Sequence, residues 1–177
     1  MRPAAVVTLF LALPLLAADK PVVVKLGNLS APAPAGWKGE RPANRLRSYQ
    51  FKLPGEKGGP GDAELVVMQS GKASKEFPRW KAGFVPPDGK TVDDISRVRK
   101  IDGAKGATID LLDVTGTWRY KAAPFDPKSK EELKDDYRVV WVVVADDGET
   151  NQLRLSGPRE TVDKYYPGLE KFLKALK

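Results

Sequence analysis

The run from Tyr137 to Ala145 constrains the fold more than any other segment of the chain. Its centre, Val139 to Val144, reads Val-Val-Trp-Val-Val-Val and has no polar position. β-Branched residues favour strands, and a strand without polar positions can be buried on both faces. The run ends at Asp146-Asp147-Gly148, a pattern typical of a tight hairpin turn. We therefore predict a central strand with further structure packed on each side of its sheet.

Six other segments have the residue types and lengths of strands. Two of these predicted strands are joined by the glycine-rich loop Gly55–Asp62, and another two by Asp102–Gly106. The proline-rich stretch Ala31–Pro34 is expected to form a stiff turn after the first strand. The predicted strands are Pro21–Leu29, Leu46–Leu53, Ala63–Gln69, Ile95–Ile101, Ala107–Tyr120 and Asn151–Ser156.

Two segments show helical periodicity. Between Ala73 and Phe84, the aromatic residues Phe77, Trp80 and Phe84 recur every three or four positions, which places them on one helix face. The second helix is expected from Arg159 to Leu176, with Pro158 at its first position. Pro167 within that helix predicts a kink or a break, because proline lacks an N–H donor.

The charged segment Lys121–Asp136 has no apolar periodicity, so we expect an exposed loop with at most one helical turn at Glu131–Lys134. The complete pattern is six or seven strands and two main helices. It predicts an α+β fold around an antiparallel sheet.

Residues Met1 to Ala18 have the pattern of a secretory signal peptide. Arg2 precedes an apolar stretch of about 13 residues, too short to span a bilayer, and Ala17-Ala18 supplies small residues for cleavage. We expect residues 1–18 to be removed and residues 19–177 to form one domain that is exported to the periplasm or the exterior. A membrane-spanning segment is not expected.

The chain contains neither cysteine nor histidine. Disulfides and the usual zinc, copper, haem and iron–sulfur ligand sets are therefore excluded, and so is a Ser-His-Asp arrangement. The composition favours a protein that is not an enzyme and holds no cofactor or metal. A pair of catalytic carboxylates, as in glycosidases, and Ser-Lys chemistry are the enzymatic alternatives that remain open.

The formal charge of +7 raises the question of a nucleic-acid partner. Acidic pairs such as Glu131-Glu132 and Asp135-Asp136 interrupt the basic residues, so a mixed solvated surface is the preferred interpretation. We expect no nucleic-acid partner, and a monomer.

The order of short motifs along the chain resembles the PsbP-like family, and in particular its exported bacterial members. The matching pieces are Ala35-Gly36-Trp37, Ala63–Val67, Arg79-Trp80 with Phe84, Asp113–Trp118, and Leu153–Pro158 leading into Thr161-Val162. The resemblance implies a three-layer α/β/α sandwich and a role in binding or assembly without catalysis. Partners of other family members are not carried over, because a fold does not set function.

Four residues are candidates for partner binding: Arg79, Trp80, Trp118 and Tyr120. Trp, Tyr and Arg are the residue types that most often anchor a partner, although core packing is the preferred interpretation of the two tryptophans. Trp37 is open to the same two interpretations, whereas Trp141 within the valine run is expected in the core.

Three further patterns are weaker. Asp110, Asp113, Asp146 and Asp147 could supply an all-oxygen metal site, but turn formation explains the last two better. The loop Gly55–Asp62 could hold an anion, and Ser70-Gly71-Lys72 matches only the end of a phosphate loop.

These observations predict an exported, non-enzymatic interaction or assembly domain with an unknown protein partner. The alternatives are a module that binds a small ligand or an envelope surface and, third, a carboxylate-dependent hydrolase.

Overall fold

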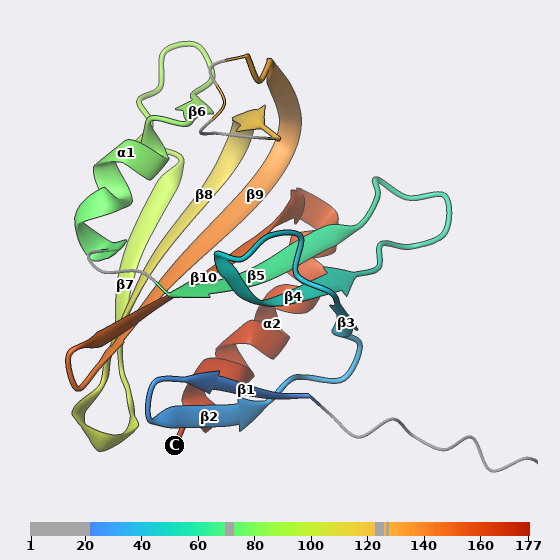
Figure 1. The fold of residues 1–177 in the computed structure, drawn as a ribbon. Helices are drawn as coiled ribbons and strands as arrows, with labels where there is room; N and C mark the ends of the chain where they lie inside the picture. Colours follow the sequence, from blue (N-terminus) through green and yellow to red (C-terminus); the bar gives the residue numbers. More distant parts are fainter. Residues whose placement is uncertain (1–21, 70–72, 123–125, 127) are drawn as a thin grey trace, which may run out of the picture.

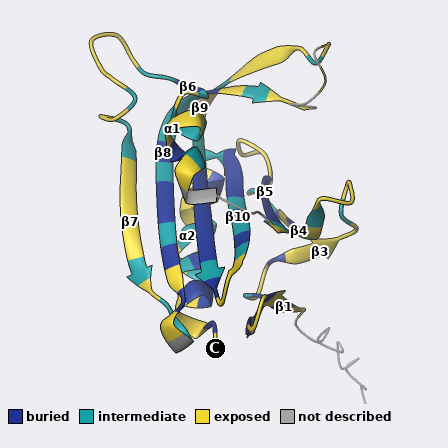
Figure 2. Ribbon diagram, turned by 60° about the vertical axis from the view of Figure 1, so that its left-hand side comes forward, coloured by how far each residue is buried: buried dark blue, intermediate teal, exposed yellow. Residues whose placement is uncertain are grey.

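Three long antiparallel strands form the centre of the fold. The computed structural model describes residues 22–69, 73–122, 126 and 128–177. Its central strands are β8 (Thr108–Lys121), β9 (Glu131–Asp146) and β10 (Glu149–Pro158), and β9 pairs with both neighbours. Every residue from Val139 to Val144 is buried (Figure 2). The prediction of a central strand covered on both faces is confirmed.

Shorter strands extend this sheet on both sides (Figure 1). The order is β3-β4-β5-β10-β9-β8-β6, and β7 also pairs with β8. All of these pairings are antiparallel. The remaining strands of the sheet are β3 (Lys38–Glu40), β4 (Arg47–Leu53), β5 (Ala63–Gln69), β6 (Phe84–Val85) and β7 (Ser96–Asp102).

The two faces of the sheet carry different amounts of cover. On one face, helix α2 (Arg159–Ala175) and the hairpin of β1 (Val23–Leu26) and β2 (Leu29–Pro32) bury the larger core. On the other face, the 3₁₀ turn η1 (Ala73–Glu76) leads into α1 (Phe77–Lys81), whose Phe77 packs in a smaller core. The α+β class is confirmed, whereas the three-layer description stays a prediction.

The alternation of β9 explains how one strand serves both cores. Val140, Val142 and Val144 belong to the core beneath α2, while Val139, Trp141 and Val143 belong to the core beneath α1. Successive strand residues point to opposite faces, so a fully apolar strand can fill both. The hairpin that follows β9 has positive φ angles at Asp147 (43°) and Gly148 (82°), as a type I′ turn requires.

The charged segment differs from its prediction. Strand β9 begins at Glu131, so neither a loop as far as Asp136 nor a helical turn at Glu131–Lys134 is present. Residues 131–134 pair with residues 118–121 of β8, and Arg119 forms an ion pair with Glu131 at 3.2 Å. This arm of the β8–β9 hairpin lies beyond the core, and Leu133 is 59% exposed. Its residues therefore lack the alternation of apolar and polar side chains by which a strand is predicted.

The predicted first strand is also wrong in part. It is two strands that form the β1–β2 hairpin, because Gly27 turns the chain with a φ of 62°. Ala31 and Pro32 belong to β2 rather than to a turn. Asp146 accepts a hydrogen bond from the backbone N–H of Asn28 at 3.2 Å, which ties this hairpin to the end of β9.

The helices depart from expectation at their ends. The first helix stops at Lys81, and Phe84 lies in β6, although Phe77, Trp80 and Phe84 do share one core. Helix α2 is unbroken through Pro167 because its packed residues, among them Val162, Leu169 and Phe172, lie on both sides of the proline. Pro158 is the last residue of β10 and occupies the N-cap position of α2, one residue before the first helical position.

The strand number within the described residues is ten, above the predicted six or seven. The difference comes from the division of the first predicted strand into β1 and β2 and from the unpredicted β3 and β6, all of which have two to four residues. Such short strands lack a readable alternation. No helix among the described residues is long and apolar enough to cross a bilayer.

Gly157 tests the close approach of β10 to β5. A Cβ atom on Gly157 would lie 2.5 Å from the Cβ of Ala63 and 2.7 Å from its Cα, so the two backbones would have to separate. We expect Gly157→Ala to lower the free energy of unfolding in urea by about 2 kcal/mol or more.

The matched control is Gly168→Ala in α2. There the nearest atom to a new Cβ is the Cβ of Pro34 at 3.7 Å, an ordinary contact. Alanine favours a helix, so this variant should gain about 0.5 to 1 kcal/mol. Equal effects at the two glycines would contradict the close approach.

Candidate functional site

The structure brings Trp118 and Tyr120 together with a third ring, that of Tyr137. The Trp118 ring centroid lies 5.2 Å from that of Tyr120 and 5.5 Å from that of Tyr137. Trp118 and Tyr120 lie on the outer half of β8, where a register shift between Gly116 and Trp118 interrupts regular pairing with β9. Trp118 is 9% exposed, and both tyrosines are half-buried. The three rings form one partly open aromatic surface.

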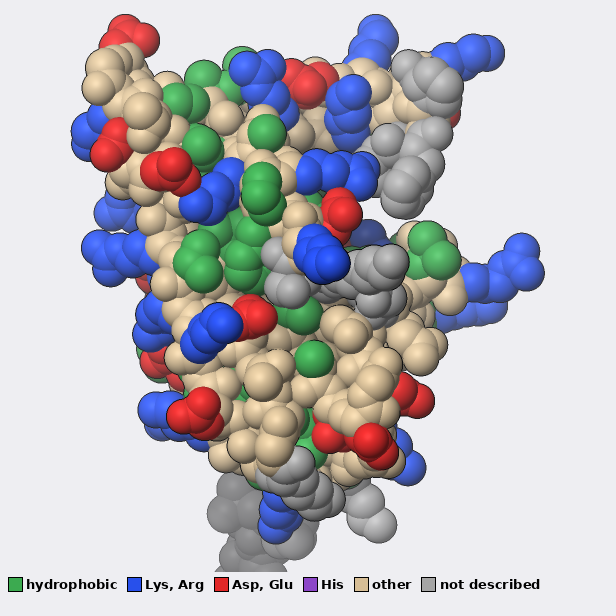
Figure 3. Space-filling model, turned by 90° about the vertical axis from the view of Figure 1, so that its left-hand side faces the viewer, with side chains coloured by type: hydrophobic (Ala, Val, Ile, Leu, Met, Phe, Trp, Pro, Cys, Tyr) green, Lys and Arg blue, Asp and Glu red, His purple; other side chains and the backbone are tan. Residues whose placement is uncertain are grey.

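The other two predicted residues lie elsewhere. Trp80 is half-buried on α1 and stacks on Trp141 at 5.4 Å. Arg79 is exposed and pairs with Glu76 of the preceding turn at 3.1 Å. Phe84 lies between the Trp80–Trp141 pair and Trp118, because its ring contacts both Trp141 and Trp118. Figure 3 shows hydrophobic side chains between charged groups on the side of the molecule that carries α1 and β7.

Trp37 and Trp141 are core residues. Trp37 is 8% exposed, and its ring packs on Phe51 at 5.3 Å and on Phe172 at 5.5 Å, between the sheet and α2. The core interpretation of Trp141 is confirmed by its 4% exposure.

The aromatic surface forms one wall of a groove of about 260 Å³, which we name the aromatic groove. Strands β4, β5 and β10 supply the opposite, charged wall. The lining residues are Arg47, Asp62, Glu64, Trp118, Tyr120, Lys134, Tyr137, Arg154 and Ser156.

Two arginines in this groove share a single carboxylate oxygen. Oε1 of Glu64 accepts hydrogen bonds from Arg47 Nη1 at 3.0 Å and from Arg154 Nη2 at 3.4 Å. The guanidinium of Arg154 also lies 5.6 Å from the ring of Trp118, and its buried Nε has no hydrogen-bond partner among the described residues. Burial is the main cause that lowers the pKa of Arg154.

Sequence reasoning missed Arg47, Glu64 and Arg154. A signal for Arg154 was present, because Leu153 and Leu155 turn toward one core and must leave Arg154 on the opposite face of a central strand. Its meeting with residues some 90 positions away depends on the pairing of β10 with β5.

The remaining charged groups of the groove have partners of their own. Lys52 Nζ lies 2.7 Å from Asp62 Oδ2, and Lys134 Nζ lies 2.6 Å from Glu132 Oε2. Among the described residues, the groove therefore has one positive charge in excess. The two arginines that face Glu64 share it.

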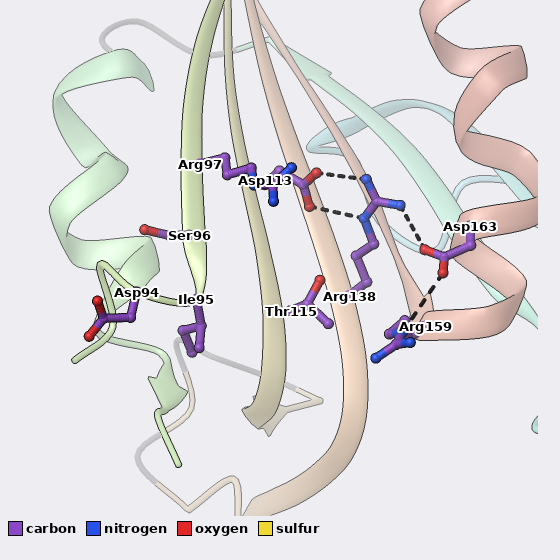
Figure 4. Close-up of a pocket in the computed structure, with 9 residues that line it drawn as sticks. All are labelled: Asp94, Ile95, Ser96, Arg97, Asp113, Thr115, Arg138, Arg159 and Asp163. Carbon is purple, nitrogen blue, oxygen red and sulfur yellow. Dashed lines mark hydrogen bonds and ion pairs between the residues drawn. The ribbon is translucent and has the colours of Figure 1, made fainter. Parts of the chain in front are cut away.

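A larger hollow, of about 390 Å³, lies on the α2 side of the sheet between β7, β8, β9 and the start of α2 (Figure 4). At its centre, Arg138 contacts Asp113 through two hydrogen bonds of 3.0 and 2.6 Å and Asp163 through one of 2.7 Å. The same guanidinium lies 4.2 Å from the ring of Tyr166. Burial alone lowers the pKa of Arg138, but the hydrogen bonds to both carboxylates outweigh burial and raise it.

Charges in this larger hollow balance. It is lined by three arginines, Arg97, Arg138 and Arg159, and three aspartates, Asp94, Asp113 and Asp163. Arg159 Nε lies 3.8 Å from Asp163 Oδ2, so the strand arginine and the helix arginine both contact Asp163. This network attaches α2 to β8 and β9, and we interpret it as structural.

Asp113 and Asp163 converge as a carboxylate pair would in a hydrolase, but both are hydrogen-bonded to Arg138. A catalytic acid must hold its proton near neutral pH, which requires a raised pKa. Among the described residues, every carboxyl with a resolved shift has a lowered pKa, namely Asp62, Asp94 and Glu170. Both carboxylates therefore belong to the Arg138 network that attaches α2 to the sheet.

The weaker candidates do not assemble into sites. Asp110 lies 3.9 Å from Lys100, Asp113 contacts Arg138, and Asp146 closes the β1–β2 hairpin. The described residues hold no group of three or more acidic side chains placed to bind a metal. Within Gly55–Asp62, the Asp62 carboxylate itself accepts the N–H of Gly55 at 2.9 Å, which removes a donor that an anion would need. Ser70-Gly71-Lys72 lies outside the described residues.

Comparison with known proteins leaves the function open. No protein-family model matches the chain, and no curated protein matches it. A solved structure from Pseudomonas aeruginosa, described as a protein of unknown function and a proposed regulator, aligns with a TM-score of 0.47 at 12% identity. The alignment covers 90% of this chain and 97% of the other. A likeness of this size carries no inference about function, and PsbP-like membership stays a prediction.

The structural interpretation of the larger hollow predicts the effect of Asp113→Asn. The Arg138–Asp113 side chains are only 15% and 18% exposed, so loss of one charge leaves Arg138 poorly compensated. We expect a loss of about 2 kcal/mol in urea unfolding. Lys100→Gln, at an exposed pair on the same sheet, should cost about 0.5 kcal/mol or less. Similar costs would contradict the interpretation.

Glu170 predicts part of the acid sensitivity of the fold. Its hydrogen bond from Arg99, 2.6 Å long, is the main cause that lowers its pKa below 4.5. A carboxyl with a lowered folded-state pKa stabilises the fold above its unfolded pKa, and this stabilisation is lost as the pH falls through the folded pKa. Urea unfolding from neutral pH to about pH 3 should therefore show a shallower acid decline for Glu170→Gln than for the wild type.

Glu160→Gln is the control for this titration. Glu160 lies on the same helix and has no ion pair within the described part of the chain. Its acid decline should match that of the wild type, and parallel declines for all three proteins would contradict the role of Glu170.

Proposed function

We propose that this protein is an exported, non-catalytic binding domain that docks a partner protein through the aromatic groove. The observation that carries the proposal is the meeting of Trp118, Tyr120 and Tyr137 with Arg154 at one partly open surface. Trp, Tyr and Arg concentrate binding energy when a partner buries them.

The size of the groove favours a protein partner over a free cofactor. A volume of about 260 Å³ is below the roughly 300 to 1,000 Å³ of most small-molecule pockets. It suits one anchoring side chain or chain end, with the surrounding surface supplying the rest of the interface. A small-ligand module remains the second candidate because the groove is concave and lined by rings.

Three further parts of the proposal rest on the sequence. Export rests on residues 1–18, which lie outside the described residues, and the single domain is residues 19–177. The resemblance to the PsbP-like family supports a three-layer α/β/α sandwich and a role without catalysis. We expect the isolated protein to be a monomer.

The experiment is crosslinking capture with the tagged mature protein from the exported fraction of its own cells, at low and high salt. Contacts of the rings should survive high salt, whereas contacts between exposed charges are screened. We expect one stoichiometric partner, and recovery lowered about tenfold or more by Trp118→Ala or Tyr120→Ala.

The matched control is Arg79→Ala, because Arg79 has an exposed side chain and does not line the groove. It should recover the partner as well as the wild type does. Equal recovery by all variants would place the docking surface elsewhere, and an empty capture would favour the small-ligand candidate.

A further inference from the structure

The aromatic groove contains an incomplete charge network. Arg47 and Arg154 reach the same oxygen of Glu64, and the second contact is long, at 3.4 Å. Two guanidinium groups thus share one carboxylate, which leaves one positive charge in excess. The larger hollow provides the contrast, since it is lined by equal numbers of arginines and aspartates, three of each.

Arg154 carries most of this deficit. Its side chain is 23% exposed, its Nε is buried without a partner in the described structure, and Arg47 has a second acceptor in Gln50 at 2.8 Å. Removing a cation from water is costly unless an anion compensates it. A further anion in the groove would supply that compensation.

The rings decide what can accompany the anion. Trp118 lies beneath the Arg154 guanidinium, and Tyr120 and Tyr137 continue the same aromatic wall. Trp118 is 9% exposed, so the half-buried rings of Tyr120 and Tyr137 supply most of the accessible part of this wall. They favour a flat apolar group, which can stack against them at the offsets that aromatic pairs prefer.

We infer that the aromatic groove binds a carboxylate carried beside a flat apolar group, with Arg154 and Arg47 as its anion receptors and the three rings as its platform. This inference rests on the proposed function and names the chemistry of the anchor. The planar guanidinium fork matches a carboxylate. A singly charged anion balances the one positive charge in excess. A phosphate dianion carries more negative charge than this and would be repelled by Glu64 and Asp62 in the same groove.

Calorimetric titration of the mature protein with phenylacetate tests the inference. Phenylacetamide has the same shape without the charge, acetate lacks the ring, and benzylphosphonate carries more charge. We expect each of the three to bind about tenfold more weakly than phenylacetate. Equal affinity for phenylacetate and phenylacetamide, or no binding of phenylacetate, would overturn the inference.

Charge variants separate a receptor from a structural arginine. Arg154→Gln should weaken phenylacetate about tenfold, while Arg159→Gln, in the balanced hollow, should leave it unchanged. Glu64→Gln removes the competing carboxylate and should tighten phenylacetate several-fold, provided thermal unfolding shows a folded protein. A Glu64→Gln protein that is folded but binds phenylacetate more weakly would overturn the inference, whatever the stability of Arg154→Gln.

Two peptides that end in phenylalanine distinguish the sources of the carboxylate. Binding of the peptide with a free carboxyl end, and not of its amidated form, would assign the anchor to a partner's chain end. If phenylacetate binds and neither peptide does, the carboxylate belongs to a free small acid. That result would overturn the proposed protein partner and leave the inference about the groove intact. A protein captured through Trp118 by a groove that does not prefer phenylacetate would keep the proposed function and overturn the inference.

Discussion

Burial of β9 on both faces is the constraint on which the rest of the structure depends. Because Val139 to Val144 has no polar side chain, this strand must be covered from two directions, and the two cores are the result. Its neighbours β8 and β10 satisfy its backbone groups over most of its length. A polar residue inside the run would be buried without a partner, which is among the most costly substitutions that a core can suffer.

The two faces are covered unequally, and the candidate site follows from that difference. Helix α2 and the β1–β2 hairpin close one face. On that face, the charge of Arg138 is compensated by the carboxylates of Asp113 and Asp163. The short α1 covers only part of the other face, so Trp118, a buried member of the smaller core, and the half-buried Tyr120 and Tyr137 packed against that core line a groove. Hollows of similar kind thus have different chemistry: one is internally neutralised, and the other has two arginines for one carboxylate.

Long strands and tight turns were predicted well because their signals are local. The β4–β5, β7–β8 and β9–β10 hairpins and α2 agree with expectation within a few residues. The predictions failed where pairing outweighs composition: three of the four residues 131–134 are charged, and yet they form a strand because they pair with β8. Short edge strands such as β3 and β6 were missed for the same reason. Among the residues that line the aromatic groove, Trp118 and Tyr120 were singled out from the sequence, whereas Arg47, Glu64 and Arg154 were missed.

The sequence by itself determined the α+β class, the buried central strand, the absence of cysteine and histidine chemistry, and the two aromatic residues of the outer β8. Only the tertiary structure decided which charges meet. Glu64 and Arg154 are 90 residues apart, and the register of β5 against β10 brings them together. Hydrophobic periodicity can be recognised from residues that are close in the sequence. Charge compensation depends instead on which strands pair and on which side chains then share one face.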